Sequence, residues 1–332
     1  MLDVVFVHRK PHRGNFSLER LFADIRSALP SDIVPRVWEC PYLSQGLFRR
    51  VYNMLAATAH QGTVTHITGD VNYVALLLRR SRTLLTLPDI VLLHRLKGWR
   101  RAVAKALWFR LPAARVARIV TISEAVRQEV IRVISCAPQF VTTIHVPIST
   151  RFTPDPRRFN VARPRILMLG SAWNKNLARQ TEALRGLSCE VDFVGLLSDE
   201  HRSAFEKAGV TFTHSFGLSD EEMHVRYKSC DLVLFASLYE GFGMPIAEAQ
   251  AVGRPVVTST TSSMPEVAGD AACLVDPTNT TAIRAGVDKV IRDEEYRAGL
   301  VSRGYVNASR FAPARIAAQY AELYRELAQA SA

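Results

Sequence analysis

The sequence predicts an α/β protein with two Rossmann-like units, each built on a parallel sheet. Short runs rich in Val and Ile alternate with amphipathic segments of helix length, a pattern typical of parallel α/β units. This alternation stops at a Pro-containing stretch, Ser149–Arg165, and then starts again. The 332 residues also exceed the ~250–300 at which a single hydrophobic core stops growing. We therefore expect one domain over residues 1–160 and another over 161–332, with ligands bound in a cleft between them at the carboxyl ends of the strands.

The elements of the first half follow this pattern in chain order. Predicted strands are Val4–His8, Ile33–Trp38, Val64–Ile67, Thr83–Leu87 and Ile119–Ile122. Predicted helices are Leu18–Ala28, Leu47–Ala57, Arg101–Arg110 and Ser123–Val133, the last with Ser123 as its N-cap. The Ser149–Arg165 stretch, with Pro154, Pro156 and Pro164, is expected to be an interdomain linker.

The second half repeats the alternation and then ends in helix. Strands are predicted at Arg165–Met168, Glu190–Val194, Val210–Thr213, Leu232–Phe235, Pro255–Thr258 and Ala272–Val275, with helices between them. Residues from about Thr281 to Ala330 are almost wholly helical in pattern, and the C-terminal helix is expected to pack back on the first domain.

Charge is distributed unevenly between the two halves. Residues 1–160 hold 24 Lys and Arg against 10 Asp and Glu, whereas residues 161–332 hold 18 against 21. A basic half favours an anionic partner such as phospholipid headgroups, a lipid-linked pyrophosphate or nucleic acid, although a merely solvated basic face is the alternative. The five cysteines have no C-x-x-C spacing, which favours a reducing compartment. With no signal peptide or membrane-spanning stretch in the sequence, we expect a cytoplasmic protein, at most peripheral to the inner face of the cytoplasmic membrane.

The segment Ser237–Ala249 carries the clearest chemical signal. It follows an apolar strand, passes through a turn with Gly241 and Gly243, and enters a helix with Pro245 in its first turn. The backbone N–H groups of Phe242, Gly243 and Met244 would face an anion at the helix N-terminus, and a diphosphate is the expected occupant. Glu240 and Glu248 would border the same pocket, where carboxylates accept hydrogen bonds from sugar hydroxyls.

This segment resembles the E-x7-E signature of glycosyltransferase family 4, the group 1 glycosyltransferases, which have the GT-B fold. Further blocks match in the same order: Leu218–Glu222, Cys230–Phe235, Gly253–Ser259 and Met264–Ala272. The resemblance implies that Glu240 contacts the donor sugar and Glu248 the ribose of the nucleotide. Both residues also have a local explanation, as a carboxylate that caps the turn and an acid near a helix N-terminus.

A second phosphate-binding element is expected after the first strand of this domain. By the resemblance, Gly170 begins a loop in which Lys175 meets the donor diphosphate, and Ser171 stands where many relatives carry an arginine. Lys175 and Glu240 are therefore the predicted catalytic residues, joined by Asp89 from the first domain. Base recognition is assigned to His214–Gly217, with Phe216 as its contact, although these residues contain no readable base code.

The first domain departs from the family pattern at one position. Residues Leu84–Ile90 resemble the strand that ends in a His-Asp pair, but Pro88 replaces the histidine and Asp89 follows. Either Asp89 or His94 lines the pocket instead, or a different sugar is used, or turnover is poor. Gly14, Asn15, His66 and Asp70 are weaker acceptor-side candidates, and a structural role is the better interpretation for His66 and Asp70.

The resemblance to family 4 implies a retaining, metal-independent hexosyltransferase. No D-x-D pair stands at a strand end to hold a metal, and no other cofactor is expected. The donor is a GDP- or UDP-sugar, with mannose favoured, and the acceptor is a glycan or lipid-linked saccharide of surface polysaccharide synthesis. Two alternatives remain: a catalytically weak GT-B subunit that binds nucleotide and supports a partner enzyme, suggested by Pro88, and a basic nucleic-acid-binding protein, which would leave the phosphate-binding turns unexplained.

Overall fold

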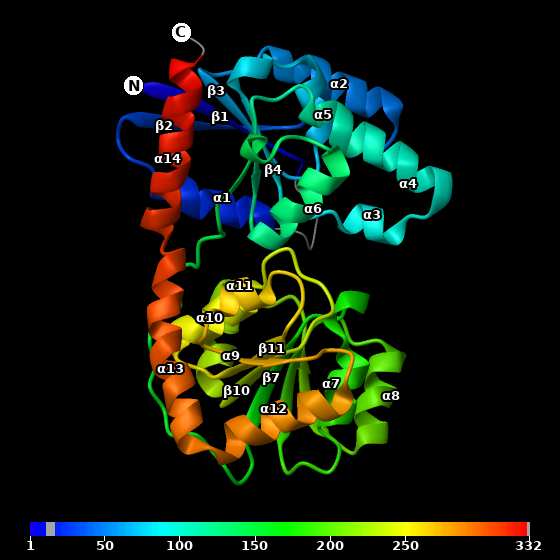
Figure 1. Ribbon diagram of the computed structural model, residues 1–332, viewed down its shortest axis with the longest axis vertical. Coiled ribbons are helices and arrows are strands. Elements are labelled where there is room, and N and C mark those ends of the chain that lie inside the picture. The colour runs from blue at the N-terminus through cyan, green and yellow to red at the C-terminus, as the bar shows by residue number, and fades with distance from the viewer. Residues whose placement is uncertain (11–16, 331–332) are drawn as a thin grey trace. The chain divides into compact units, whose positions relative to one another are not determined.

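The computed structural model describes residues 1–10 and 17–330 and contains two compact units (Figure 1). The first comprises Met1–Pro147 with Pro313–Ala332, and the second comprises Ile148–Ala312. Each unit has one six-stranded sheet, and every described strand pair is parallel. The predicted α/β fold with two parallel sheets is therefore confirmed. The break between the units falls earlier than the expected boundary after residue 160.

The sheet of the first unit has the order β2-β1-β3-β4-β5-β6. Its strands are β1 (Leu2–His8), β2 (Ile33–Glu39), β3 (Val64–Thr68), β4 (Thr83–Leu87), β5 (Arg118–Thr121) and β6 (Val141–Thr143). Buried Val5, Ile67 and Leu85 belong to the hydrophobic core of this unit. The strand order reverses between β1 and β3, so the carboxyl ends of these two strands flank a topological switch point.

Helices of the first unit connect these strands. They are α1 (Ser17–Ser27), α2 (Leu47–Thr58), α3 (Val91–Arg95) and α6 (Glu124–Ile134), together with a helical run over residues 98–113. This run consists of α4 (Gly98–Ala104), the π-helix η3 (Lys105–Arg110) and α5 (Leu111–Ala113), and it contains the predicted helix Arg101–Arg110. Ser123 is the N-cap of α6, as predicted, because its hydroxyl accepts the Val126 N–H at 3.2 Å.

The last helix, α14 (Pro313–Gln329), belongs to the first unit although it ends the chain. It contacts α1, β1 and β3, and it buries Ile316, Tyr320 and Tyr324. At the surface, Arg325 forms a bidentate ion pair with Asp32, at 2.8 and 3.0 Å. The expected extent of the second domain, 161–332, is therefore too long at its carboxyl end, and the expected return of this helix is observed.

The sheet of the second unit has the order β12-β11-β10-β7-β8-β9. Its strands are β7 (Arg165–Leu169), β8 (Glu190–Val194), β9 (Thr211–Ser215), β10 (Leu232–Phe235), β11 (Val256–Ser259) and β12 (Cys273–Val275), all at the predicted places. Numbered within the unit, this is the doubly wound order 3-2-1-4-5-6, which reverses between β7 and β10. Loops at the carboxyl ends of β7 and β10 therefore flank the switch point where such sheets bind ligands.

Helices of the second unit lie between these strands and then follow one another to its end. They are α7 (Leu177–Ala183), α8 (Asp199–Ala208), α9 (Asp220–Ser229), α10 (Met244–Val252), α11 (Met264–Ala268), α12 (Thr280–Arg292) and α13 (Glu294–Ala308). The helical pattern predicted for residues 281–330 is thus confirmed as α12, α13 and α14, with one turn of 3₁₀-helix at Ser309–Phe311. Within the residues described, no helix is both long and apolar enough to cross a bilayer.

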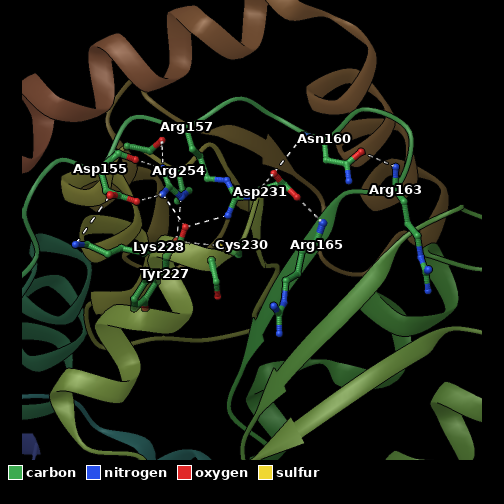
Figure 2. Close-up of polar contacts among 12 residues, drawn as sticks. Asp155, Arg157, Asn160, Arg163, Arg165, Tyr227, Lys228, Cys230, Asp231 and Arg254 are labelled. Carbon is green, nitrogen blue, oxygen red and sulfur yellow. Dashed lines mark hydrogen bonds and ion pairs between the residues drawn. The ribbon is translucent and has the colours of Figure 1, made fainter.

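Residues 148–164 have no regular secondary structure but are bound to the second unit, and Figure 2 shows these contacts. Asp155 accepts a hydrogen bond from the buried Arg254 guanidinium at 2.9 Å, and Asn160 donates its N–H to Asp231 at 3.2 Å. The same Asp231 carboxylate accepts the Arg165 N–H at the start of β7, at 2.8 Å. The predicted linker is therefore a strap, residues 148–164, that belongs to the second unit.

Candidate active site

The polar side chains of the second unit gather where β7 and β10 end. Gly170 follows β7 directly, and the segment Ser237–Gly243 follows β10. The two loops are joined by backbone and side-chain hydrogen bonds. Leu238 N–H donates to the Asn174 carbonyl at 2.7 Å, and the Asn174 amide donates to the Tyr239 carbonyl at 2.8 Å. The predicted donor-binding loops are thus a single hydrogen-bonded unit at the switch point.

The loop after β7 depends on glycine at position 170. Gly170 has φ +84°, a left-handed conformation that favours glycine. A Cβ at this position would lie 2.8 Å from Cε of Lys175, so the lysine side chain passes directly over the glycine. Ser171 accepts the Leu196 N–H at 3.1 Å, which ties this loop to the residues after β8. Gly170 therefore allows the close passage of Lys175.

Lys175 and Glu240 form an ion pair across the two loops. Lys175 Nζ lies 2.7 Å from Glu240 Oε1, and the two side chains are 21% and 12% exposed. The Lys175 ammonium also lies 4.7 Å from the centroid of the Phe235 ring, a cation–π contact. The Asn174 amide approaches the same Oε1 at 3.5 Å. A cation for phosphate and a carboxylate for hydroxyl groups are therefore held side by side.

Two serines after β11 fix the backbone of Glu240. The Ser262 and Ser263 hydroxyls both donate to the Glu240 carbonyl, at 2.6 and 2.9 Å. Ser262 also accepts the Glu240 N–H at 3.3 Å, and Ser263 donates to the Phe242 carbonyl at 2.7 Å. Sequence reasoning missed both serines, because their only signal is their position just before the matched block Met264–Ala272.

The turn with Gly241 and Gly243 leads directly into α10, as predicted. Gly243 is the N-cap of the helix with φ +102°, and Pro245 lies in the first turn. Pro lacks an N–H, so its place at the start of the helix removes no helical hydrogen bond. The N-terminus of the nine-residue α10, which begins at Met244, lies beside the loop that carries Glu240. A helix N-terminus in this place favours an anionic group.

Glu248 lies one helical turn inside α10 and is bound to α9. Its Oε2 accepts a hydrogen bond from the hydroxyl of Tyr227, which is fully buried, at 2.6 Å. Burial raises the pKa of Glu248 to about 7, against the opposing effect of the Tyr227 hydrogen bond. The same burial raises the pKa of Tyr227 well above its ordinary value. Sequence reasoning missed Tyr227, which carries no motif of its own.

Phe216 is the exposed residue of the segment predicted to recognise the base. It follows β9 with 63% of its surface exposed and precedes Gly217, whose φ is +70°. Its neighbour His214 bonds to the Gly195 carbonyl at 2.7 Å and stacks on Phe193. The aromatic face of Phe216 is therefore available at the carboxyl end of β9, while His214 has a structural role.

In the first unit, His66 lies in the core. Its Nδ1 is 2.7 Å from the Tyr324 hydroxyl, and its Nε2 is 2.7 Å from the Thr86 hydroxyl. The side chain is 0% exposed, and burial holds its pKa well below the ordinary value. Both ring nitrogens are thus used in packing, so His66 offers no atom to an acceptor and the structural interpretation is the better one.

The other candidates of the first unit lie at strand ends or outside the described residues. Asp70 follows β3 and accepts a hydrogen bond from Arg9, which follows β1, at 3.0 Å across the switch point. Asp89 follows β4, and its Oδ1 accepts the Val91 N–H at 2.9 Å at the start of α3. Burial raises the Asp89 pKa. Gly14 and Asn15 lie outside the residues that the structure describes.

A metal site is not evident in the described side chains. Over residues 1–10 and 17–330, no three His, Cys, Asp or Glu side chains are grouped closely enough to hold a metal ion. The polar groups at the β7–β10 switch point instead combine one ammonium, two carboxylates and a helix N-terminus. This set is suited to a phosphorylated ligand that also carries hydroxyl groups.

Comparison with known proteins agrees with this chemistry. Residues 152–306 match the family model of glycosyl transferases group 1. Over 108 residues the chain is 36% identical to O-antigen chain mannosyltransferase B of Escherichia coli, which covers 32% of this chain and 28% of the relative. Over 218 residues it is 29% identical to MMP alpha-(1->4)-mannosyltransferase of Mycolicibacterium hassiacum, covering 57% and 52%. The matches thus span about a quarter and half of these curated relatives' lengths.

Solved structures show the same fold over nearly the whole chain. Anabaena Alr3699/HepE, in complex with UDP and glucose, superposes with a TM-score of 0.77 at 16% identity, over 98% of this chain and 100% of that one. WaaG, a glycosyltransferase involved in lipopolysaccharide biosynthesis, superposes with a TM-score of 0.72 at 13% identity, over 97% and 99%. This chain therefore has the GT-B fold, and its residues 152–306 match the glycosyl transferases group 1 family.

Proposed function

We propose that the chain is a retaining hexosyltransferase that needs no metal ion and uses a nucleotide-sugar donor. The observation that carries this proposal is the Lys175–Glu240 pair, at 2.7 Å, beside the N-terminus of α10 at the switch point of the second sheet. The donor diphosphate would lie against Lys175 and the helix N-terminus, and the sugar hydroxyls would reach Glu240. Glu248 would accept hydrogen bonds from the ribose.

The hydrogen bonds of Glu240 and Glu248 are consistent with these proposed roles. In the described part of the chain, Asn174 and Lys175 both contact Oε1 of the Glu240 carboxylate, which leaves Oε2 for a sugar hydroxyl. Likewise Tyr227 binds Oε2 of Glu248, which leaves Oε1 for a ribose hydroxyl. In the transfer, the bond between the anomeric carbon and the diphosphate oxygen breaks, and the acceptor oxygen bonds to that carbon. The acceptor proton passes to the leaving diphosphate, whose charge Lys175 and the helix N-terminus would stabilise.

Mannose is the favoured sugar, and GDP or UDP the favoured nucleotide. The support is that the similar proteins from E. coli and M. hassiacum are named mannosyltransferases, while the similar Anabaena structure holds UDP and glucose. For the acceptor we propose a glycan or lipid-linked saccharide of surface polysaccharide synthesis at the inner face of the cytoplasmic membrane. The basic first half of the chain is suited to such an acceptor.

Calorimetric titration with GDP, UDP and ADP tests the donor site. We expect one nucleotide to bind, and Lys175→Ala and Glu248→Ala each to weaken it at least tenfold. Lys207→Ala, on the exposed side of α8, is the matched control and should leave affinity unchanged. Transfer from the corresponding sugar nucleotide is then followed by NMR, where retention of the anomeric configuration and turnover in EDTA are expected. Nucleotide binding without transfer would instead favour the catalytically weak subunit suggested by Pro88, and absence of binding by every nucleotide would favour a degenerate, non-catalytic relative.

A further inference from the structure

Helix α2 of the first unit turns an apolar face to solvent. Leu47, Phe48, Val51, Tyr52 and Leu55 follow the spacing of one helix face, and each is exposed, Phe48 by 90% and Leu47 by 72%. The opposite side of the helix buries only Asn53 and Ala57. An amphipathic helix normally buries its apolar face, so this arrangement is reversed.

A second apolar stripe runs along the helical segment 98–113. Trp99, Val103, Leu107 and Leu111 recur at every fourth residue, and they are 72%, 45%, 48% and 47% exposed. Four-residue spacing places them in one row along a continuous helix. Phe109 and Ala113, on the other side, are buried in the core, and Ala104 and Trp108 pack against it.

The two stripes belong to one surface, which we call the α2–α4 face. Figure 1 shows α2 and α4 side by side in the first unit, and the Arg50 guanidinium lies 4.4 Å from the centroid of the Trp108 ring. A groove of about 400 Å³ lies between them, with Trp99, Val103 and Leu107 among its lining residues. The exposed apolar side chains of the 98–113 segment therefore line this groove, and α2 reaches it through Arg50.

These two segments, taken together with α3 (Val91–Arg95) and the residues that join it to α4, are strongly basic. Residues 47–58 and 91–113 contain eight Lys and Arg and no Asp or Glu. None of the eight is in an ion pair among the described residues. Arg49 and Arg100 are exposed directly beside Phe48 and Trp99. Unpaired cations next to exposed aromatic and aliphatic side chains require a partner that is both anionic and apolar.

We propose that the α2–α4 face docks on an anionic lipid bilayer. Leu47, Phe48 and Trp99 would enter the boundary between headgroups and acyl chains, and the neighbouring arginines would meet headgroup phosphates. A second copy of this chain is disfavoured, because it would place eight cations against eight others. Nucleic acid would satisfy the arginines but leave the aliphatic stripe in water. The inference adds a place of action to the proposed transferase, and vesicle binding can be tested without any donor.

Vesicle co-sedimentation of the full chain tests the proposal. We expect binding to phosphatidylcholine vesicles that contain 30% phosphatidylglycerol, and little binding to phosphatidylcholine alone. The double variant Phe48→Ser/Trp99→Ser should lower the partition coefficient at least tenfold. Arg49→Glu/Arg100→Glu should lower it more, because each arginine near the surface contributes about fivefold. The matched control, Arg79→Glu/Arg80→Glu, makes the same charge change on exposed residues outside the face and should change binding by much less.

Insertion and folding are measured separately. Fluorescence of the wild type should be quenched by brominated lipid, and the Trp99→Phe variant should lose that quenching. Every variant should bind nucleotide like the wild type, which shows that a loss of vesicle binding is not a loss of fold or of donor site. Three results would overturn the proposal: unchanged vesicle binding by Phe48→Ser/Trp99→Ser, a dimer that those substitutions dissociate, or oligonucleotide binding without quenching by brominated lipid.

Discussion

Lys175 and Glu240 are two charges held largely away from water, each the principal partner of the other. Their 2.7 Å contact offsets the cost of burying both, and removal of one partner leaves the other charge uncompensated. We therefore expect Lys175→Met to lower the free energy of unfolding by about 1–2 kcal/mol. The double variant Lys175→Met/Glu240→Gln should recover most of that loss. Urea unfolding of the wild type, both single variants and the double variant measures the coupling.

An exposed ion pair provides the control for this cycle. Arg185 and Glu182 lie 2.7 Å apart on the same unit, but their side chains are 53% and 49% exposed. The corresponding cycle there should give a much smaller coupling, because solvent screens the two exposed charges. Equal coupling in the two cycles would show that the Lys175–Glu240 pair has no special stabilising role.

Glu248 should make both nucleotide binding and stability depend on pH near neutrality. Its pKa of about 7 means that its carboxyl is partly protonated at neutral pH, whereas the ribose hydroxyls need an acceptor. Nucleotide affinity should therefore rise between pH 6 and pH 8, with release of a proton that calorimetry detects as a dependence on buffer ionisation enthalpy. Glu248→Gln should bind more weakly at pH 8 and show no such proton release.

The effect of Glu248 on stability has the opposite sign, because its stabilising contribution falls as pH rises whereas nucleotide affinity rises. Because the folded-state pKa lies above the ordinary 4.5, the folded protein binds the proton more tightly than the unfolded chain. This contribution is complete below pH 4.5 and is lost as pH rises through 7. Glu248→Gln should thus be more stable than the wild type at pH 8 and equally stable at pH 4.5. A constant difference across this range would contradict a raised pKa.

At the scale of elements, the conformation of the loop after β7 can be tested by adding a single atom, a Cβ at Gly170. Gly170→Ala introduces a Cβ 2.8 Å from the Lys175 side chain at φ +84°, so both the backbone and Lys175 must shift. We expect a loss of about 1–2 kcal/mol in unfolding free energy and weaker nucleotide binding. Gly186→Ala is the matched control, since Gly186 has φ +69° but nothing within 4 Å of the added atom. It should lose a similar backbone contribution and leave nucleotide affinity unchanged.

The strap over residues 148–164 depends on one buried arginine. Arg254 is 2% exposed and donates to the carbonyl oxygens of Tyr227, Lys228 and Asp155 as well as to the Asp155 carboxylate (Figure 2). Arg254→Ala would leave these acceptors without their donor, and we expect it to lower the unfolding free energy of the second unit by about 3–5 kcal/mol.

The control for the strap is Arg151→Ala. Arg151 pairs with Glu221 in an exposed contact, with side chains 54% and 74% exposed. Its loss should change stability by less than about 0.5 kcal/mol. Limited proteolysis should then cleave the strap in the Arg254→Ala variant and spare it in the Arg151→Ala variant. Cleavage at equal rates would show that Arg254 does not hold the strap.

Most elements could be predicted from hydrophobic period, and the exceptions have physical causes. All strands of the second sheet were expected, since each is a run of apolar residues bounded by turns. The three-residue β6 was missed because Val141–Thr143 is too short for a period to be visible. The strap was taken for a linker because its prolines and mixed charges are typical of linkers, whereas the residue that binds it, Arg254, lies about a hundred residues later.

Only those residues of the candidate site that belong to a sequence motif could be predicted. Lys175, Glu240 and Glu248 were found from their blocks, but their roles stay predictions. Tyr227 binds the Glu248 carboxylate, and Ser262 and Ser263 bind the Glu240 backbone carbonyl. These contacts join residues about twenty positions apart, with no fixed spacing that a sequence pattern could reveal. His66 illustrates the converse error, in which a core residue is taken as a candidate site residue. A histidine at a strand end can equally be a packed core residue.

For the whole molecule, the two units should respond to acid differently. Burial lowers the pKa of His8 to about 4, and that of His66 well below its ordinary value, so the first unit keeps both neutral. The unfolded chain binds these protons below about pH 6.5, so the first unit loses stability as pH falls from 6.5 towards 4. Protonation of Glu248 acts in the other direction on the second unit over the same range.

Urea unfolding at pH 7.5 and pH 5 measures this difference. Trp38 and Trp108 report on the first unit and Trp173 on the second, in variants where the remaining tryptophans are phenylalanine. We expect the midpoint of the first unit to fall at pH 5 and that of the second to change little or rise. A parallel loss in both units would show that neither the histidines nor Glu248 dominates the pH dependence.

The position of α14 bears on how the protein is made. The ribosome completes the second unit before it synthesises residues 313–332, which follow directly and supply Tyr320 and Tyr324 to the core of the first unit. The first unit therefore cannot complete its core until α14 has been synthesised, and His66 lacks its Tyr324 partner until then. Nascent chains should thus expose the incomplete first unit to chaperones and proteases until α14 has been synthesised. A circular permutant that begins with α14 would place all of that unit's sequence together and remove the wait.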